Sequence, residues 1–90
     1  MLVINNPKKV LGFIFARSLY MIVSELNDQA ERQFGSARVS LKVKDNKLHA
    51  IVETRLDVNE AAARAKKFEE WWEAASGTAA PLIVVDVVAR

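Results

Sequence analysis

Apolar residues recur every three to four positions in the first third of the chain, the spacing of one face of an α-helix. The stripe runs through Leu11, Phe15, Leu19, Ile22, Leu26 and Ala30. Asn6 is a preferred N-cap residue, and Pro7 suits the first helical position, where its missing N–H costs nothing. Gly35 tolerates the left-handed backbone that often follows a helix. The pattern therefore predicts one helix over residues 7–34.

The apolar period changes to two after Gly35, as in strands that bury one face. One apolar row contains Ala37, Val39, Leu41 and Val43, and a second contains Leu48, Ala50, Val52, Thr54 and Leu56. Asp45-Asn46 lies between the rows, and both residue types tolerate the positive φ of a two-residue hairpin turn. These segments predict a β-hairpin over residues 37–56.

A second helical stripe follows the hairpin. It contains Val58, Ala61, Ala65, Phe68, Trp72 and Ala75. Asp57 precedes the stripe and Glu60 comes three residues later, a spacing that resembles a capping box. Gly77 and Pro81 bracket the helix exit. The β-branched run over residues 82–89 predicts a final strand.

The predicted element order is (β)αββαβ, in which residues 1–4 form a short first strand or remain outside the sheet. We predict one α+β domain over residues 1–90, a split β-α-β, ferredoxin-like two-layer sandwich. In that fold two helices cover one face of an antiparallel or mixed sheet. Without the first strand, the order αββαβ describes a close relative.

Apolar residues exceed what this core needs in two segments, residues 10–23 and the last strand, which is apolar on both faces. Trp71 adjoins Trp72 and lies about 100° away on the flank of the second helix. Aromatic residues on such flanks often anchor protein interfaces. We therefore expect a protein partner, a homo-oligomer or both. The candidate interface residues are Phe13, Tyr20, Trp71, Leu82, Val84 and Val88.

The apolar run over residues 10–23 follows Lys8-Lys9, an order typical of signal peptides. Arg17 divides the run, and its helical length of about 21 Å is shorter than the bilayer core of about 30 Å. We expect a soluble amphipathic helix, a cytoplasmic location and no membrane partner. A targeting segment over residues 8–23 is the alternative.

The outward face of the predicted hairpin is basic and offers an alternative function, the binding of nucleic acid through phosphate contacts. The residues that would bind nucleic acid are Arg38, Lys42, Lys44, Lys47 and Arg55. The face carries no aromatic residue on which an unpaired base could stack. A solvated face and a face for an acidic protein partner are the other interpretations.

Composition excludes several kinds of chemistry. The 90 residues include no cysteine, which removes disulfides, thiol catalysis and thiolate metal sites. His49 is the one histidine, and the net charge is only +2. No acid–base or nucleophile–base pair and no glycine-rich phosphate loop can be assembled by spacing. We therefore predict no catalytic site, no metal and no cofactor.

Several short segments resemble a known family in order along residues 18–76. They are Ser24-Glu25-Leu26, Gln33-Phe34, Val39, Val43, Asn46-Lys47-Leu48 and Glu70-Trp71-Trp72-Glu73-Ala74-Ala75. Together they resemble the helix, hairpin and Trp-bearing helix of the DinI-like proteins of bacteria, plasmids and phages. The resemblance implies a non-enzymatic regulatory or accessory protein that binds the RecA recombinase filament through an acidic helix. The matching helix in this chain has nearly balanced charges.

Overall fold

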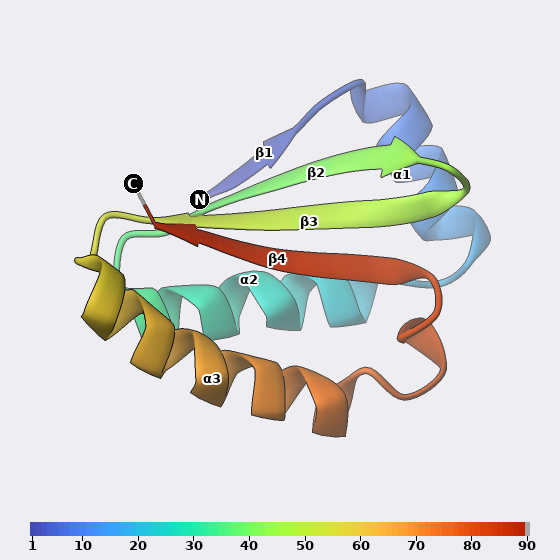
Figure 1. Cartoon of the computed structure of the whole chain (residues 1–90). Helices are drawn as coiled ribbons and strands as arrows, with labels where there is room; N and C mark the ends of the chain where they lie inside the picture. The colour runs from blue at the N-terminus through green and yellow to red at the C-terminus, as the bar shows by residue number, and fades with distance from the viewer. Residues whose placement is uncertain (90) are drawn as a thin grey trace.

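The computed structural model describes residues 1–89 as a mixed sheet with helices packed against one of its faces (Figure 1). The elements are β1 (Leu2–Ile4), α1 (Pro7–Ala16), α2 (Tyr20–Phe34), β2 (Arg38–Lys44), β3 (Lys47–Thr54), α3 (Val58–Ala75), the 3-10 turn η1 (Gly77–Ala79) and β4 (Ile83–Ala89). The α+β class is confirmed, and the apolar run at the start of the chain contributes a strand.

The four strands lie in the order β1-β2-β3-β4. β1 is parallel to β2, β2 is antiparallel to β3, and β3 is parallel to β4. The ferredoxin-like order is not confirmed, because that fold inserts another strand between the two strands that each helix connects. Here the strands before and after each helical connection are direct neighbours.

The two β-α-β units have opposite hands. Both units step in the same direction across the sheet, one from β1 to β2 and the other from β3 to β4. The strands of the first unit run antiparallel to those of the second. Since α2 and α3 lie on the same face of the sheet, one crossover must be left-handed (Figure 1). Right-handed crossovers account for nearly all known cases. The ferredoxin-like order would make both crossovers right-handed, so strand order and handedness depart from the prediction together.

The predicted single helix over residues 7–34 is wrong, because the chain breaks between α1 and α2 and their axes differ by 115°. Ser18 adopts φ 54, in the left-handed region. The Ser18 N–H donates to the Phe15 carbonyl at 3.3 Å, and the Leu19 N–H donates to the Ile14 carbonyl at 2.9 Å. This pair of bonds is a Schellman motif, which satisfies the last carbonyl groups of α1.

The break changes which side of α1 is buried. Val10 and Ile14 are 0% and 4% exposed, whereas Leu11 and Phe15 are 40% and 66% exposed. Leu11 and Phe15 would lie in the core only if the α2 stripe continued through one straight helix. Once α1 turns by 115°, a different side of it faces the sheet. In α2 the stripe is confirmed, since Leu26 and Ala30 are buried.

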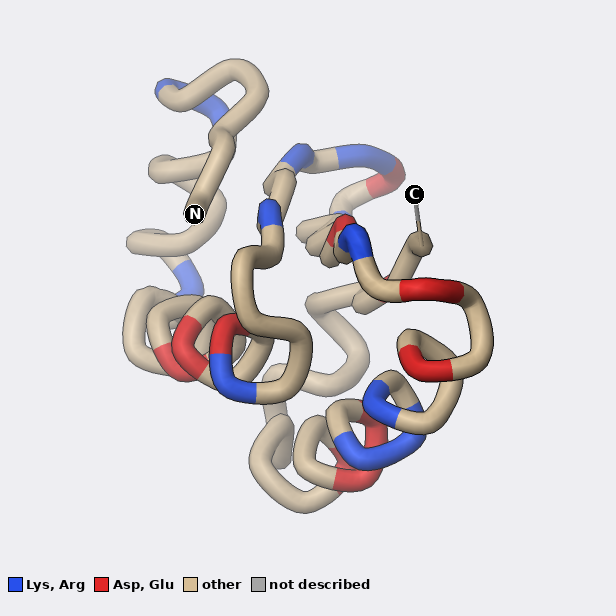
Figure 2. Tube along the Cα trace, turned by 90° about the vertical axis from the view of Figure 1, so that its left-hand side faces the viewer, with Lys and Arg blue, Asp and Glu red and all other residues tan. Residues whose placement is uncertain are grey.

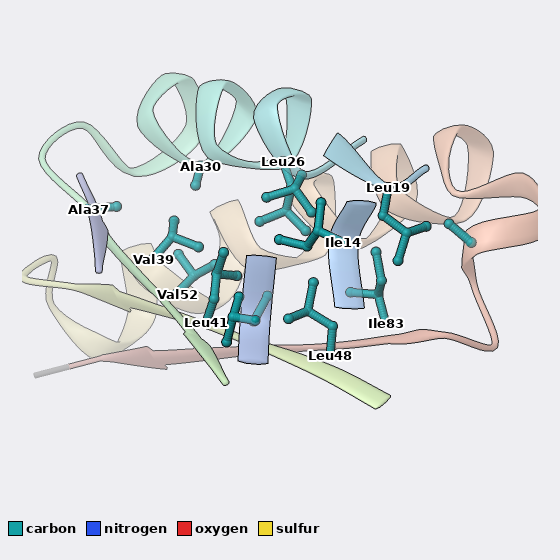
Figure 3. Close-up of a cluster of buried hydrophobic side chains, with 14 of the residues drawn as sticks. Ile14, Leu19, Leu26, Ala30, Ala37, Val39, Leu41, Leu48, Val52 and Ile83 are labelled. Atoms are coloured by element: carbon teal, nitrogen blue, oxygen red, sulfur yellow. The ribbon is translucent and has the colours of Figure 1, made fainter. Parts of the chain in front are cut away.

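The core lies between the helices and one face of the hairpin (Figure 3). Val39, Leu41, Leu48, Ala50 and Val52 alternate along β2 and β3 and are at most 1% exposed. The predicted hairpin and its turn are confirmed, since Asp45 and Asn46 have φ 53 and 61. Ile83 on β4 extends this face. The buried helix and loop residues that pack against it include Ile14, Leu19, Leu26, Ala30, Phe34 and Phe68.

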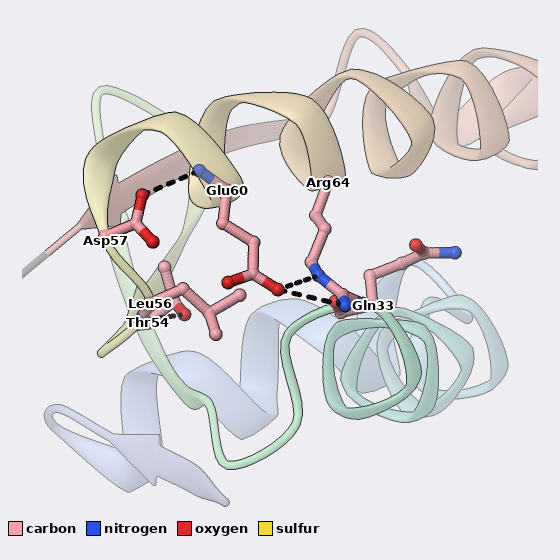
Figure 4. Close-up of polar contacts among 6 residues, drawn as sticks. All are labelled: Gln33, Thr54, Leu56, Asp57, Glu60 and Arg64. Atoms are coloured by element: carbon pink, nitrogen blue, oxygen red, sulfur yellow. Dashed lines mark hydrogen bonds and ion pairs between the residues drawn. The ribbon is translucent and has the colours of Figure 1, made fainter.

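Polar contacts position α3 against α2 (Figure 4). The Asp57 carboxylate accepts a hydrogen bond from the Glu60 N–H at 3.0 Å, which confirms the predicted cap of α3. Arg64 pairs with Glu60 at 3.2 Å and also donates to the Gln33 carbonyl at 2.8 Å, in the last turn of α2. Asn6 does not cap α1 with its side chain, because it adopts left-handed backbone with φ 49.

Within residues 1–89 no single helix is long and apolar enough to cross a bilayer. Taken together, α1 and α2 reach the length and composition of a span, but they are bent by 115° at the break.

Candidate functional site

β4 is an edge strand of the sheet. It pairs with β3, and no described strand pairs with its other side. The strand reads IVVDVVA, so it lacks the proline, glycine and lysine residues that often protect exposed edges. Asp86 is its single charged residue and is exposed. The backbone groups along this edge are therefore available to pair with another strand.

The side chains of β4 alternate between the two faces of the sheet. Val85 and Val87 pack against the core, and Val84 and Val88 point to the open face, the face away from α2 and α3. Val84 is half-buried and Val88 is 44% exposed. On β3, half-buried Ile51 lies directly beside Asp86 and between these two valines. The edge thus carries a short apolar strip on the open face.

Leu82 does not belong to this strip. It is half-buried and packs against the core, and its carbonyl accepts a hydrogen bond from the Leu48 N–H at 2.9 Å. The prediction that Leu82 lies on the open face is wrong, because it extends the strand alternation back to residue 82. The alternation begins only at Ile83, because the preceding residues form a turn that enters the sheet from η1.

The interface candidates near the helix break divide into one buried and one exposed residue. Phe13 is 7% exposed, and the Arg17 guanidinium lies 3.8 Å from its ring centroid, so its predicted role as a surface residue is wrong. Tyr20 is 55% exposed, and its ring centroid lies 6.3 Å from that of Phe15. We call the exposed apolar residues around the break the hinge patch. It consists of Leu11, Phe15, Tyr20 and Met21.

Tyr20 is a predicted interface residue, whereas Leu11 and Phe15 are predicted members of the buried stripe. Their helical spacing was compatible with a buried stripe, so it could not reveal their exposure. The one local signal was Ser18, a residue with moderate helix propensity in the middle of an apolar run. That signal is too weak to predict a break by itself.

Trp71 is half-buried in the seam between α2 and α3. Its ring centroid lies 5.6 Å from that of Phe68 and 6.1 Å from that of Trp72. It borders a shallow hollow of about 220 Å³ whose other lining residues, Glu25, Asp28, Gln29 and Arg32, belong to α2. This position is on the helical layer, whereas Val84 and Val88 are on the open face of the sheet. The predicted interface residues therefore do not form one continuous surface.

The predicted basic residues are all exposed. They are Arg38, Lys42, Lys44, Lys47 and Arg55. Lys44 and Lys47 are directly opposite partners at the end of the hairpin, whereas Arg38 is opposite Glu53. Like charges in directly opposite positions destabilise a strand pair. Arg55 follows the end of β3, so it does not continue the row along the strands.

Charge is distributed unevenly over the molecule. Residues 1–24 contain Lys8, Lys9 and Arg17 and no carboxylate. The basic positions of the hairpin extend this cationic region, whereas most acidic positions lie on α2 and α3, as Figure 2 shows. An anionic partner is therefore expected to approach the hairpin and α1 rather than the helical layer.

His49 and Glu53 lie at different places along the hairpin, opposite Lys42 and Arg38 respectively. His49 is half-buried, and its Nε2 lies 3.3 Å from the Lys44 carbonyl oxygen. Glu53 lines a hollow of about 620 Å³ at the other end of the hairpin, and His49 is not among the lining residues. Within residues 1–89, no group of three or more His, Cys, Asp or Glu side chains is arranged to hold a metal ion.

No protein-family model, no curated protein and no solved structure matches this chain.

Proposed function

We propose that this chain is a non-catalytic protein-binding module, regulatory or accessory in role, that self-associates through the edge of β4. The observation that carries the proposal is the outer edge of β4, with which no described strand pairs, together with its strip of Val84 and Val88. Exposed apolar edges of this kind are templates for another strand. The resemblance to DinI-like proteins favours the same class of function. A role in phages or plasmids and a cytoplasmic location stay predictions.

The hydrogen bonding of β3 and β4 indicates how two copies would pair. The Leu82 carbonyl bonds to β3, and in a parallel ladder every second residue of a strand bonds to the same neighbour. The backbone groups of Ile83, Val85 and Val87 therefore point away from β3. An antiparallel pair of β4 strands around a two-fold axis at Val85 would use these groups. It would also place Asp86 opposite Val84 of the second copy rather than opposite another Asp86.

The double variant Val84→Glu/Val88→Lys is expected to raise the dimer dissociation constant by about a hundredfold or more. Both valines occur in each copy, so four charges would enter one interface, and the new carboxylate at position 84 would lie opposite Asp86 of the second copy, a like-charge pair that destabilises strand pairing. Each tenfold change corresponds to about 1.4 kcal/mol. Lysine at position 88 lies opposite Glu53, which helps the isolated sheet to accommodate it. Size-exclusion chromatography with light scattering over a concentration series measures the effect.

Val58→Lys is the matched control, because Val58 is 73% exposed on α3 and far in sequence from the edge. This variant should dimerise like the wild type. A wild-type chain that stays monomeric at high concentration would contradict the proposal. So would a double variant with an unchanged dissociation constant.

Nucleic-acid binding is the second candidate function, and the Lys44–Lys47 pair is the observation that favours it. These two cations face each other across the hairpin, next to exposed Lys42. A phosphate group between them would remove the repulsion that the free protein retains. The cationic α1 would lengthen the contact.

If the hairpin binds nucleic acid, affinity for DNA or RNA should fall about a hundredfold between 50 and 200 mM salt, the value for roughly four phosphate contacts. Lys42→Glu/Lys44→Glu/Lys47→Glu should abolish binding in a fluorescence anisotropy titration. The control is Lys66→Glu/Lys67→Glu, which reverses two exposed charges on α3. Equal loss in both variants would indicate a net-charge effect and reject a hairpin site.

A further inference from the structure

The connection between α1 and α2 is short and strained. Arg17, Ser18 and Leu19 make the whole turn, and Ser18 has φ 54 at a position where glycine is the usual residue. A serine in left-handed backbone is less stable than the same serine in a right-handed helix. The bent connection therefore stores strain that a straight helix would release.

The sequence pattern around this connection belongs to a straight helix. In a continuous helix Leu11 and Phe15 would lie on the same stripe as Leu19 and the buried residues of α2. In the bent form they are 40% and 66% exposed. The apolar pattern and the strain at Ser18 are independent observations, and both favour a straight helix.

A single chain cannot straighten without losing part of its core. Val10, Phe13 and Ile14 of α1 are buried against the rest of the domain, and β1 pairs with β2 over only three residues. Straightening would carry residues 1–17 away from these contacts. A second copy can restore all of them, because its own residues 1–17 make the same contacts.

We propose that residues 1–17 exchange between two copies of this chain, with α1 and α2 joined at Ser18 into one helix in each copy. The hinge patch supports a second copy as the occupant. Its members, Leu11, Phe15, Tyr20 and Met21, all lie near the hinge, and hinge residues of two exchanged chains meet around the two-fold axis. The exchange does not depend on the β4 edge and is a separate route to a dimer.

Substitutions at Ser18 test the hinge. Ser18→Ala favours the straight helix and should raise the dimerisation constant at least about tenfold. Ser18→Gly relaxes the left-handed backbone of the bent form and should lower the dimerisation constant by a similar factor. The control is Asp45→Gly, which relaxes a positive φ of 53 in the hairpin turn and should leave the constant unchanged. Light scattering after equilibration at several concentrations gives the constants.

A disulfide shows which copy contributes β1. The chain has no cysteine, and Val3 and Ser40 are register partners on β1 and β2. Oxidised Val3→Cys/Ser40→Cys should give a disulfide-linked dimer on a non-reducing denaturing gel when it is taken from the dimer fraction. Protein taken from the monomer fraction should form this disulfide only within one chain and should run as a monomer on the same gel.

Three results would overturn the exchange. The first is a dimer whose disulfides are all within one chain, which would indicate side-by-side association such as the β4 edge provides. The second is a protein that stays monomeric at every concentration, Ser18→Ala included. The third is an interchain disulfide with equal dimerisation constants for Ser18→Ala and Ser18→Gly, since the hinge would then have no influence. If Ser18→Ala aggregates, the wild type and Ser18→Gly still provide the comparison.

Discussion

Phe68→Ala is expected to lower the free energy of unfolding by about 3–5 kcal/mol. Phe68 is 0% exposed and is among the largest fully buried side chains of the domain. Its ring centroid lies 5.7 Å from that of Phe34 on α2 and 5.6 Å from that of Trp71. Truncation would leave a cavity where α2, α3 and the sheet meet. Since the free energy of unfolding of a native protein is about 5–15 kcal/mol, this substitution would remove much of the stability.

Urea unfolding followed by far-ultraviolet circular dichroism measures this change. At about 4–8 °C per kcal/mol, thermal unfolding should shift by more than about 12 °C. Phe68→Leu keeps more of the side-chain volume than Phe68→Ala and should lower the free energy of unfolding clearly less. Val58 is exposed, so Val58→Ala should change the free energy of unfolding by only about 0.5 kcal/mol. A loss below about 1 kcal/mol for Phe68→Ala would show that α3 does not pack against this core.

Ile14→Ala and Phe15→Ala should differ strongly although the two residues are neighbours. Ile14 is 4% exposed in the core, so its truncation should cost about 2–5 kcal/mol. Phe15 is 66% exposed and contacts Tyr20 at the surface, so its truncation should cost less than about 1 kcal/mol. Chemical unfolding at low protein concentration, where the monomer dominates, measures both.

This pair distinguishes the bent helix from a straight helix packed on the sheet of its own chain. In that position a straight helix over residues 7–34 would place Phe15 in the core stripe and Ile14 on its flank, so the two losses of stability would be reversed. Equal losses of stability for the two substitutions would contradict both arrangements, because each arrangement buries one of the two residues and exposes the other. Leu11→Ala offers a further check, because it should follow Phe15→Ala in the bent form.

Much of the fold was predictable because its signals are local. The hairpin follows from alternation over residues 37–56 together with two turn residues that accept positive φ. The start of α3 follows from Asp57, whose carboxylate bonds to the Glu60 N–H. Each of these features depends on residues a few positions apart, so a single sequence contains the information.

The break at Ser18 and the order of the strands were not predictable in the same way. An apolar stripe gives the period of a helix, but the break changes its direction without interrupting the local pattern. Strand order depends on contacts between β1 and β2 and between β3 and β4, across long helical connections. The right-handed rule favoured an arrangement that this sheet does not adopt.

The candidate surfaces were predicted in part. Tyr20, Val84 and Val88 are at least partly accessible, as the surplus of apolar residues indicated, but Phe13 is in the core and Leu82 packs against it. Trp71 is half-buried in a different place from the β4 strip. Composition reveals that apolar residues are in surplus, whereas only packing decides which of them the solvent reaches.

The sequence by itself determined the hairpin, the helical segments, the cap of α3 and the absence of thiol chemistry, because each follows from near neighbours or from residue counts. Only the tertiary structure decided that the first helix bends at Ser18, that β4 lies at the sheet edge and that Phe15 rather than Phe13 is exposed. These outcomes depend on which segments, far apart in the chain, compete to cover one sheet face.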